Sequence, residues 1–77
     1  MSLQNGSQGK AVADLQTALR RHGLTVTDRD GVFGASTAKA VMAFRASHGM
    51  GEIGAVDQAT WRALGLPGSV PHPVRPD

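Results

Sequence analysis

The sequence contains an acidic stretch, Asp28-Arg29-Asp30-Gly31, whose spacing matches the start of a calcium-binding loop. Such a loop also needs oxygen ligands at its fifth and twelfth positions and a glycine at its sixth. The chain has Val32, Lys39 and Phe33 at those places, so a calcium site is not expected. The stretch is instead typical of a turn, in which short carboxylates accept hydrogen bonds from nearby backbone N–H groups.

A second pattern, Gly49-x-Gly51-x-x-Gly54, has the literal spacing of a dinucleotide-binding fingerprint. That fingerprint works between a strand and a helix, where its glycines let the backbone approach a pyrophosphate. Here the pattern follows a segment with helical periodicity, and the chain is too short for the strand–helix–strand unit. A helix end at Gly49 and a turn at Gly54 explain the glycines, and no nucleotide cofactor is expected.

Two histidines, His22 and His48, each come directly before a glycine at the expected end of a helix. A cation is favoured at a helix C-terminus, and both rings also fall at the edge of an apolar stripe. We therefore expect capping, or packing at the edge of the core. A metal site is not expected, because the chain has no cysteine and no third spaced ligand.

Catalytic groupings are not recognisable in the sequence. Glu52 is the only glutamate, and no serine, histidine and aspartate occur together in a catalytic context. Two carboxylates in a cleft could hydrolyse a glycan, but a core this small offers no deep pocket to activate them. We therefore expect a protein that is not an enzyme and uses no cofactor.

Length and charge narrow the class of partner. With 77 residues the chain is one domain, and it has no cysteine to form a disulfide. The net charge of +2 is scattered along the chain, which is compatible with an anionic polymer as partner. A nucleic acid is not expected, because residues 35–48 carry only Lys39 and Arg45 and make no basic recognition helix.

No run of about 18 apolar residues is present, so we expect no membrane insertion, and the residues after Met1 do not resemble a signal peptide.

Three segments have the apolar periodicity of amphipathic helices, at residues 7–22, 35–48 and 58–64. Each is followed directly by a glycine, which can take the left-handed conformation that ends a helix. Ser7 is the expected N-cap of the first helix, and Asp57 is that of the third. The sequence therefore predicts an all-α fold, a compact three-helix bundle with short connecting turns.

All four prolines lie in residues 67–77, where their rings remove backbone donors and favour extended conformations. We therefore place the domain at residues 1–66 and interpret residues 67–77 as a Pro-rich tail or linker. Within the domain, residues 30–41 and 53–64 repeat the order of a glycine turn, an apolar residue, a threonine and a final aliphatic residue. This repetition indicates a compact pseudo-symmetric bundle, because the copies are too few and too short for a solenoid.

Three longer motifs span residues 6–64. The first, Gly-Ser-x-Gly-x-x-Val-x-x-Leu-Gln-x-x-Leu, occupies residues 6–19. The second, Asp-Gly-x-Phe-Gly-x-x-Thr-x-x-Ala-Val-x-x-Phe, occupies residues 30–44, and the third, Gly-x-Val-x-x-x-Thr-Trp-x-x-Leu, occupies residues 54–64. Together they resemble the peptidoglycan-binding domain, type 1, a family found beside many cell-wall hydrolases. That family has glutamine at the position of Arg45, aspartate at that of Ile53 and glycine at that of Asp57.

The resemblance implies the three-helix fold of that family and a non-catalytic module that anchors an attached protein to bacterial cell-wall peptidoglycan. It also implies a covalently linked cell-wall hydrolase domain as partner. The implied location is extracytoplasmic, in the periplasm, the cell wall or outside the cell. A second role stays open, because similar bundles occur in the propeptides of matrix metalloproteinases: a regulatory or scaffolding domain that covers a neighbouring catalytic domain.

The aromatic residues and the helical stripes together suggest where a ligand would bind. We expect Phe33, Phe44 and Trp61 in the core, with the indole N–H of Trp61 near the surface, so a platform for stacking sugars is largely unavailable. Recognition would then use a polar groove, in which an arginine can grip a stem-peptide carboxylate with two parallel hydrogen bonds.

Five residues are predicted to contact this ligand. Gln16 and Arg45 directly follow core positions at matching places in two helices, so we expect them to point partly outward and to flank one groove. Asp30 and Thr37 would line its end, although Thr37 is also placed to bond the backbone at the start of a helix. The predicted ligand-binding residues are Gln16, Asp30, Thr37, Arg45 and Trp61.

Overall fold

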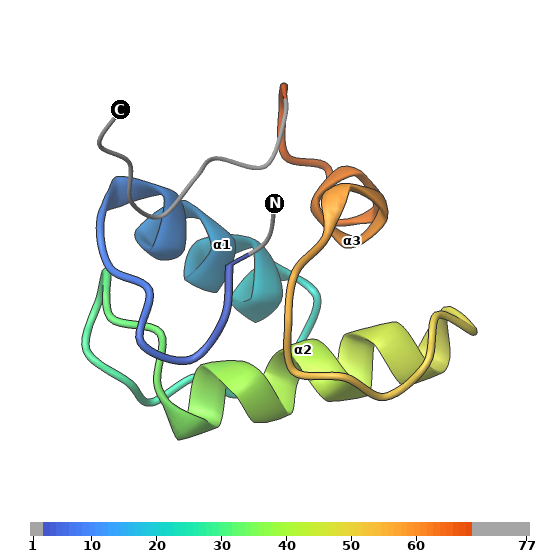
Figure 1. The fold of residues 1–77 in the computed structure, drawn as a ribbon, viewed down its shortest axis with the longest axis horizontal. Helices are drawn as coiled ribbons and strands as arrows, with labels where there is room; N and C mark the ends of the chain where they lie inside the picture. Colours follow the sequence, from blue (N-terminus) through green and yellow to red (C-terminus); the bar gives the residue numbers. More distant parts are fainter. Residues whose placement is uncertain (1–2, 69–77) are drawn as a thin grey trace.

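The computed structural model describes residues 3–68, and this part of the chain contains three α-helices (Figure 1). Helix α1 comprises Lys10–Arg21, α2 comprises Ala35–Ser47 and α3 comprises Gln58–Ala63. Pairing between extended segments within residues 3–68 is limited to two isolated bridges. The all-α three-helix fold expected from the sequence is therefore confirmed. Most of the predicted Pro-rich tail, residues 69–77, lies outside the described residues.

Each helix ends where the sequence places a glycine. Gly23, Gly49 and Gly65 follow the three C-caps with φ angles of 84°, 70° and 85°. A side chain is strained in this left-handed region, so glycine allows the chain to turn out of each helix. The N–H group of the next residue then donates to the carbonyl oxygen five residues before it, in the pairs Leu24–Leu19, Met50–Arg45 and Leu66–Trp61.

The start of α1 differs from the prediction. The helix begins at Lys10, and its N-cap is Gly9, which has a φ angle of 122° and no side-chain cap. Ser7 is not the N-cap: it is buried, and its Oγ accepts a hydrogen bond from the backbone N–H of Gln4 at 3.1 Å. The reason is that residues 6–9 pair with residues 31–33, so their backbone groups are already used outside the helix.

The N-terminal segment, residues 3–9, connects the two turns of the predicted repeat. Leu3 exchanges two backbone hydrogen bonds with Val56, at 3.1 and 2.8 Å. Farther along, the N–H of Gly6 donates to the carbonyl oxygen of Phe33 at 2.9 Å. Phe33 and Val56 occupy equivalent places in the repeat, and both are buried. One segment therefore holds both repeat units against the same core.

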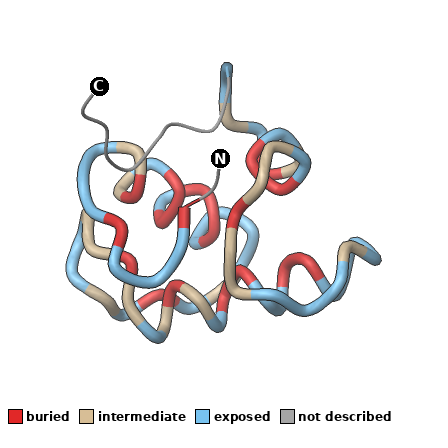
Figure 2. The backbone as a smooth tube through the Cα atoms, in the orientation of Figure 1, coloured by how far each residue is buried: buried red, intermediate tan, exposed pale blue. Residues whose placement is uncertain are grey.

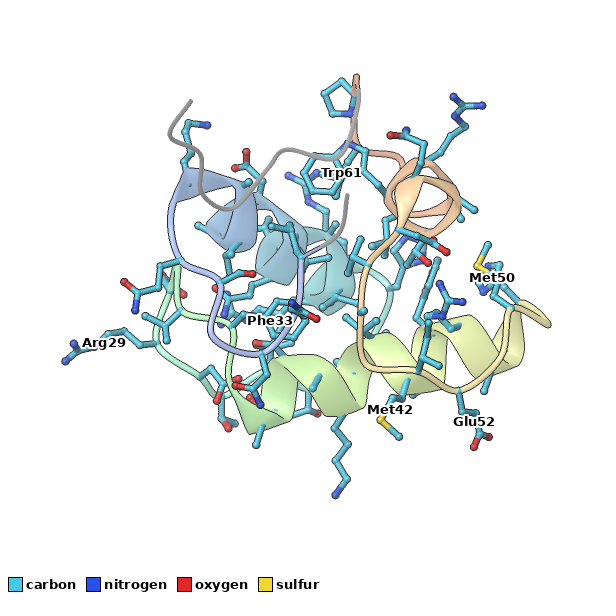
Figure 3. The ribbon with its side chains drawn as sticks, viewed as in Figure 1. Arg29, Phe33, Met42, Met50, Glu52 and Trp61 are labelled. Atoms are coloured by element: carbon cyan, nitrogen blue, oxygen red, sulfur yellow. The ribbon has the colours of Figure 1, made fainter. Side chains whose placement is uncertain are left out.

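Buried residues from all three helices and from both turns form one core (Figure 2). Phe33 lies between α1 and α2 (Figure 3), and Phe44 and Trp61 are also buried, so the core positions predicted for the aromatic residues are confirmed. The other buried apolar residues of this core are Leu3, Val12, Leu15, Ala18, Leu19, Val26, Ala40, Val41, Val56 and Leu64.

None of the helices within residues 3–68 is long and apolar enough to cross a membrane.

Candidate ligand-binding site

Gln16, the first predicted site residue, lies on α1 and is 0% exposed. Its Oε1 accepts a hydrogen bond from the N–H of Gly31 at 2.9 Å, and its Nε2 donates to the carbonyl oxygen of Val32 at 2.9 Å. Nε2 also donates to Thr37 Oγ1 at 3.1 Å. The expectation that Gln16 points outward is wrong, because its amide holds the turn before α2 against α1.

Thr37 and Asp28 together cap the start of α2. Asp28 Oδ2 accepts from the N–H of Gly34 at 3.0 Å, from the N–H of Thr37 at 2.7 Å and from the hydroxyl of Thr37 at 2.8 Å. The Thr37 N–H, helped by the Thr37 hydroxyl and by Ser36, lowers the pKa of Asp28 to about 2. A Cβ on Gly34 would lie 2.8 Å from this carboxylate, so glycine leaves the room it needs. Thr37 is fully buried. The expectation that it lines the end of an open groove is therefore wrong.

Arg45, on α2, fastens the turn before α3 from inside the domain. Its side chain is buried, and it donates from Nε to the carbonyl oxygen of Gly51 at 3.2 Å and from Nη2 to that of Met50 at 2.6 Å. Its Nη1 donates to Thr60 Oγ1 and, at 3.1 Å, to Asp57 Oδ1. The expectation that Arg45 points outward is therefore wrong, because these groups already satisfy its guanidinium.

Asp57 is the N-cap of α3, as the sequence predicts. Its Oδ1 accepts from the N–H of Thr60 at 2.9 Å and from the Thr60 hydroxyl at 2.8 Å. The Thr60 N–H is the largest cause that lowers the pKa of Asp57, and the guanidinium of Arg45 lowers it further. In the repeat, Asp57 is the equivalent of Gly34. The carboxylate that caps α3 therefore comes from the residue directly before the helix, whereas the carboxylate that caps α2 comes from Asp28 in the preceding connector.

The two remaining predicted site residues lie apart from one another. The Asp30 side chain is 79% exposed and pairs with Arg20 at 3.4 Å. Trp61 is in the core, and its Nε1 donates to the carbonyl oxygen of Pro67 at 3.0 Å. The predicted residues therefore do not form one open groove. A ligand contact at Asp30 stays a prediction, whereas the other four residues, Gln16, Thr37, Arg45 and Trp61, offer almost no surface to a ligand.

An open groove of about 260 Å³ lies instead between α1 and the segment that ends α3. Three α1 residues and the C-cap His22 follow Asp14 by three, four, seven and eight positions, so these lining residues share one face of the helix and its end. The opposite wall is the segment 64–67, whose Pro67 carbonyl is fixed by Trp61. The lining residues are Asp14, Thr17, Ala18, Arg21, His22, Leu64, Gly65, Leu66 and Pro67.

The groove combines charged groups with an apolar lining. Arg21 is exposed, and its guanidinium has no ion-pair partner within the described part of the chain. Asp14 pairs with Lys10 at 3.4 Å across open surface, where such pairs are weak. The hydroxyl of Thr17 donates to a backbone carbonyl of its own helix and keeps its lone pairs as acceptors. A ligand would therefore find a free guanidinium, a solvated carboxylate and a hydroxyl beside aliphatic carbon. The sequence contains a pattern that indicates this face, because polar side chains recur at regular spacing along one side of α1.

A second hollow, of about 360 Å³, lies between the connector after α1 and the outer face of α2. It is more apolar, and its polar groups are less available. Ser36 Oγ already accepts from the N–H groups of Thr27 and Asp28, both at 2.9 Å, which leaves Lys39 as the charged group of the lining. The remaining lining residues are Leu24, Thr25, Ala40 and Ala43.

The histidines lie at the helix ends, as expected, and pack against one aromatic ring. His48 stacks on Phe44 with a centroid distance of 4.2 Å, and His22 meets the same ring edge-on at 5.2 Å. His48 Nδ1 also lies 3.0 Å from the carbonyl oxygen of Phe44. Within residues 3–68, no three His, Cys, Asp or Glu side chains come together in a way that could hold a metal ion.

Solved structures with the same fold include proteins named for peptidoglycan binding. The N-terminal domain of SleB is 31% identical with a TM-score of 0.78, covering 84% of this chain and 89% of that domain. A fused Zn-dependent amidase/peptidase/peptidoglycan-binding domain-containing protein from Clostridium acetobutylicum is 32% identical with a TM-score of 0.79, covering 91% of this chain. A peptidoglycan-binding protein from Clostridioides difficile is 34% identical with a TM-score of 0.78, covering 84% of this chain.

The chain spans most of the SleB domain but only 32% and 40% of the two clostridial proteins. A search of curated proteins gave no match. The family model described as "Putative peptidoglycan binding domain" matches residues 8–64, which include all three helices. This chain therefore belongs to the family of peptidoglycan-binding domains.

Proposed function

We propose that this chain is a non-catalytic module that anchors an attached protein, such as a cell-wall hydrolase, to bacterial peptidoglycan outside the cytoplasm. The observation that carries the proposal is the family match over residues 8–64. The clostridial protein that combines an amidase/peptidase with such a domain supports a hydrolase as the attached partner.

The internal chemistry of the domain supports a binding role over a catalytic one. Asp28 and Asp57 each accept several hydrogen bonds at a helix start, and their lowered pKa values keep them ionised, so they serve as caps and not as proton donors. A shallow groove gives modest affinity for one wall unit. The repeating polymer then raises the effective concentration of further units, which is how such a module retains its cargo.

A fusion experiment tests the anchoring role. The chain is joined to a cell-wall hydrolase, and its activity is measured on insoluble sacculi and on soluble muropeptides. Anchoring predicts faster hydrolysis of sacculi by the fusion than by the hydrolase alone, with equal rates on soluble muropeptides. A lower rate on the soluble substrate would favour the regulatory role, in which the domain covers the active site. Equal rates on sacculi would contradict anchoring.

A further inference from the structure

We propose that the groove between α1 and residues 64–67 binds the peptide stem of the wall polymer, with Arg21 as the partner of a free stem carboxylate. This inference rests on the proposed function and specifies which part of peptidoglycan the domain recognises. Its starting point is a groove in which Arg21 has no ion-pair partner within the described residues and Asp14 pairs with Lys10 across open surface.

The wall formed by residues 64–67 is held by hydrogen bonds to α3. The N–H of Gly65 donates to the carbonyl oxygen of Arg62 at 2.9 Å, and the N–H of Leu66 donates to that of Trp61 at 3.2 Å. The indole of Trp61 lies between α3 and α1 and donates back to Pro67 at 3.0 Å (Figure 3). The groove is thus formed before a ligand arrives, so little conformational entropy is lost on binding.

Arg21 differs from Arg20 and Arg45 in its lack of side-chain partners. Arg20 donates to Asp30 and to a backbone carbonyl, and Arg45 is enclosed in the core. Arg21 lines the groove with its guanidinium unpaired within the described residues. A guanidinium offers two parallel donors that match the two oxygens of a carboxylate. In the wall polymer the free carboxylates lie on the stem peptides, because the lactyl carboxyl of N-acetylmuramic acid is used in the amide bond to the stem.

The positions of the two charges suit an extended peptide. Asp14 and Arg21 are seven residues apart on one face of α1, which corresponds to about 10 Å along the helix. An extended peptide spans this distance with about three residues. A stem that carries an ammonium group near one end and a carboxylate at the other can therefore contact both side chains, with its methyl groups against Leu66 and Pro67.

Glycan recognition is disfavoured by the same structure. Sugar rings are commonly bound by stacking on exposed aromatic side chains, and Phe33, Phe44 and Trp61 are 1%, 2% and 4% exposed. The hollow beside Lys39 offers one cation and a mainly apolar lining, without a carboxylate for the ammonium group of a stem. The observations therefore favour a stem peptide in the groove of α1.

The test is an NMR titration of the ¹⁵N-labelled chain with two probes. One is the stem tetrapeptide L-Ala-γ-D-Glu-meso-diaminopimelate-D-Ala with its amino terminus acetylated, because that amine is an amide in the wall, and the other is the neutral disaccharide N,N′-diacetylchitobiose. We expect the tetrapeptide to shift the amide signals of residues 14–22 and 64–67 and the disaccharide to leave them unchanged. Shifts centred on residues 36–43, shifts from the disaccharide alone, or no shifts up to the solubility limit of the tetrapeptide would each overturn the inference.

A matched pair of variants then tests Arg21 itself. Arg21→Ala should weaken tetrapeptide binding at least about tenfold, because it removes a charge-assisted pair. Arg29→Ala removes the same charge from an exposed side chain that points away from the body of the domain (Figure 3) and should bind like the parent. Equal affinities for the two variants would overturn the role of Arg21. Sedimentation with intact sacculi distinguishes failure of this inference from failure of the proposed function. If the parent chain sediments and Arg21→Ala behaves like Arg29→Ala, the groove assignment is refuted and the proposed function stands. If the parent chain does not sediment, the proposed function is refuted.

Discussion

At the scale of single residues, Arg45 makes four side-chain hydrogen bonds inside the domain. It reaches the carbonyl oxygens of Met50 and Gly51 and the side chains of Asp57 and Thr60. We expect Arg45→Ala to lower the free energy of unfolding by about 3 kcal/mol, because these groups lose their donor in a buried place.

The control for this prediction is Arg62→Ala on the exposed surface of α3, which should change the stability by less than about 0.5 kcal/mol. Both variants are compared with the parent by urea unfolding followed by circular dichroism. If Arg45→Ala unfolds at the same urea concentration as Arg62→Ala, the structural role of Arg45 is refuted.

Asp28 makes the stability of the domain depend on pH. Its pKa is lowered to about 2 in the folded state, from an ordinary value of 3.8, first by the N–H of Thr37. Since the folded state binds the proton less readily, the stabilisation is present above about pH 4 and is lost as the pH falls toward 2. Thermal melts of the parent should therefore drop in this window, and Asp28→Asn should be less stable at neutral pH with a flatter acid profile. The same acid profile in both proteins would contradict the assignment.

The site residues show what the sequence could not reveal. Gln16 and Arg45 follow Leu15 and Phe44, and helical periodicity reports only which residues face another helix. The structure adds the turns before α2 and α3, which cover the neighbouring face of each helix and need partners for their backbone groups. Periodicity alone therefore predicts that a polar residue beside the apolar stripe points outward, although the residue faces a turn.

At the scale of the elements, α2 depends on its aromatic residue, Phe44. Phe44 is buried and contacts both His22 and His48. We expect Phe44→Ala to lower the free energy of unfolding by about 3–5 kcal/mol, which is comparable to the whole stability of a core of this size. The matched control is Met42→Ala on the same helix, where the side chain is exposed and points away from the core (Figure 3). A melting temperature of Phe44→Ala within a few degrees of that control would contradict the core assignment.

The ends of the helices were predictable for a local reason. Gly23, Gly49 and Gly65 act through their own backbone conformation, and Asp57 caps α3 through a hydrogen bond three residues away. The start of α1 was not predictable, because residues 6–9 pair with residues more than twenty positions away in the sequence. Local signals therefore located the elements, and the long-range pairing decided where the first one begins.

At the scale of the whole molecule, the C-terminal limit of the domain is open to measurement. The sequence places it at Leu66, whereas the carbonyl oxygens of Pro67 and Gly68 accept hydrogen bonds from Trp61 and Gln58 on α3. We expect a chain that ends at Gly68 to melt like the parent and a chain that ends at Leu66 to lose about 1–2 kcal/mol through these bonds. Two truncated chains with identical melting curves would show that the contacts of residues 67 and 68 add no stability.

The central claim is that this domain binds the bacterial wall, and co-sedimentation with purified sacculi tests it most directly. The sacculi are used intact and after enzymatic removal of their stem peptides, with insoluble cellulose as a control for nonspecific adsorption. The account predicts that the folded chain sediments with intact sacculi, much less with stripped sacculi, and not with cellulose, and that added salt weakens the binding because Arg21 contributes a charge pair. A folded chain that stays in the supernatant with intact sacculi would contradict it.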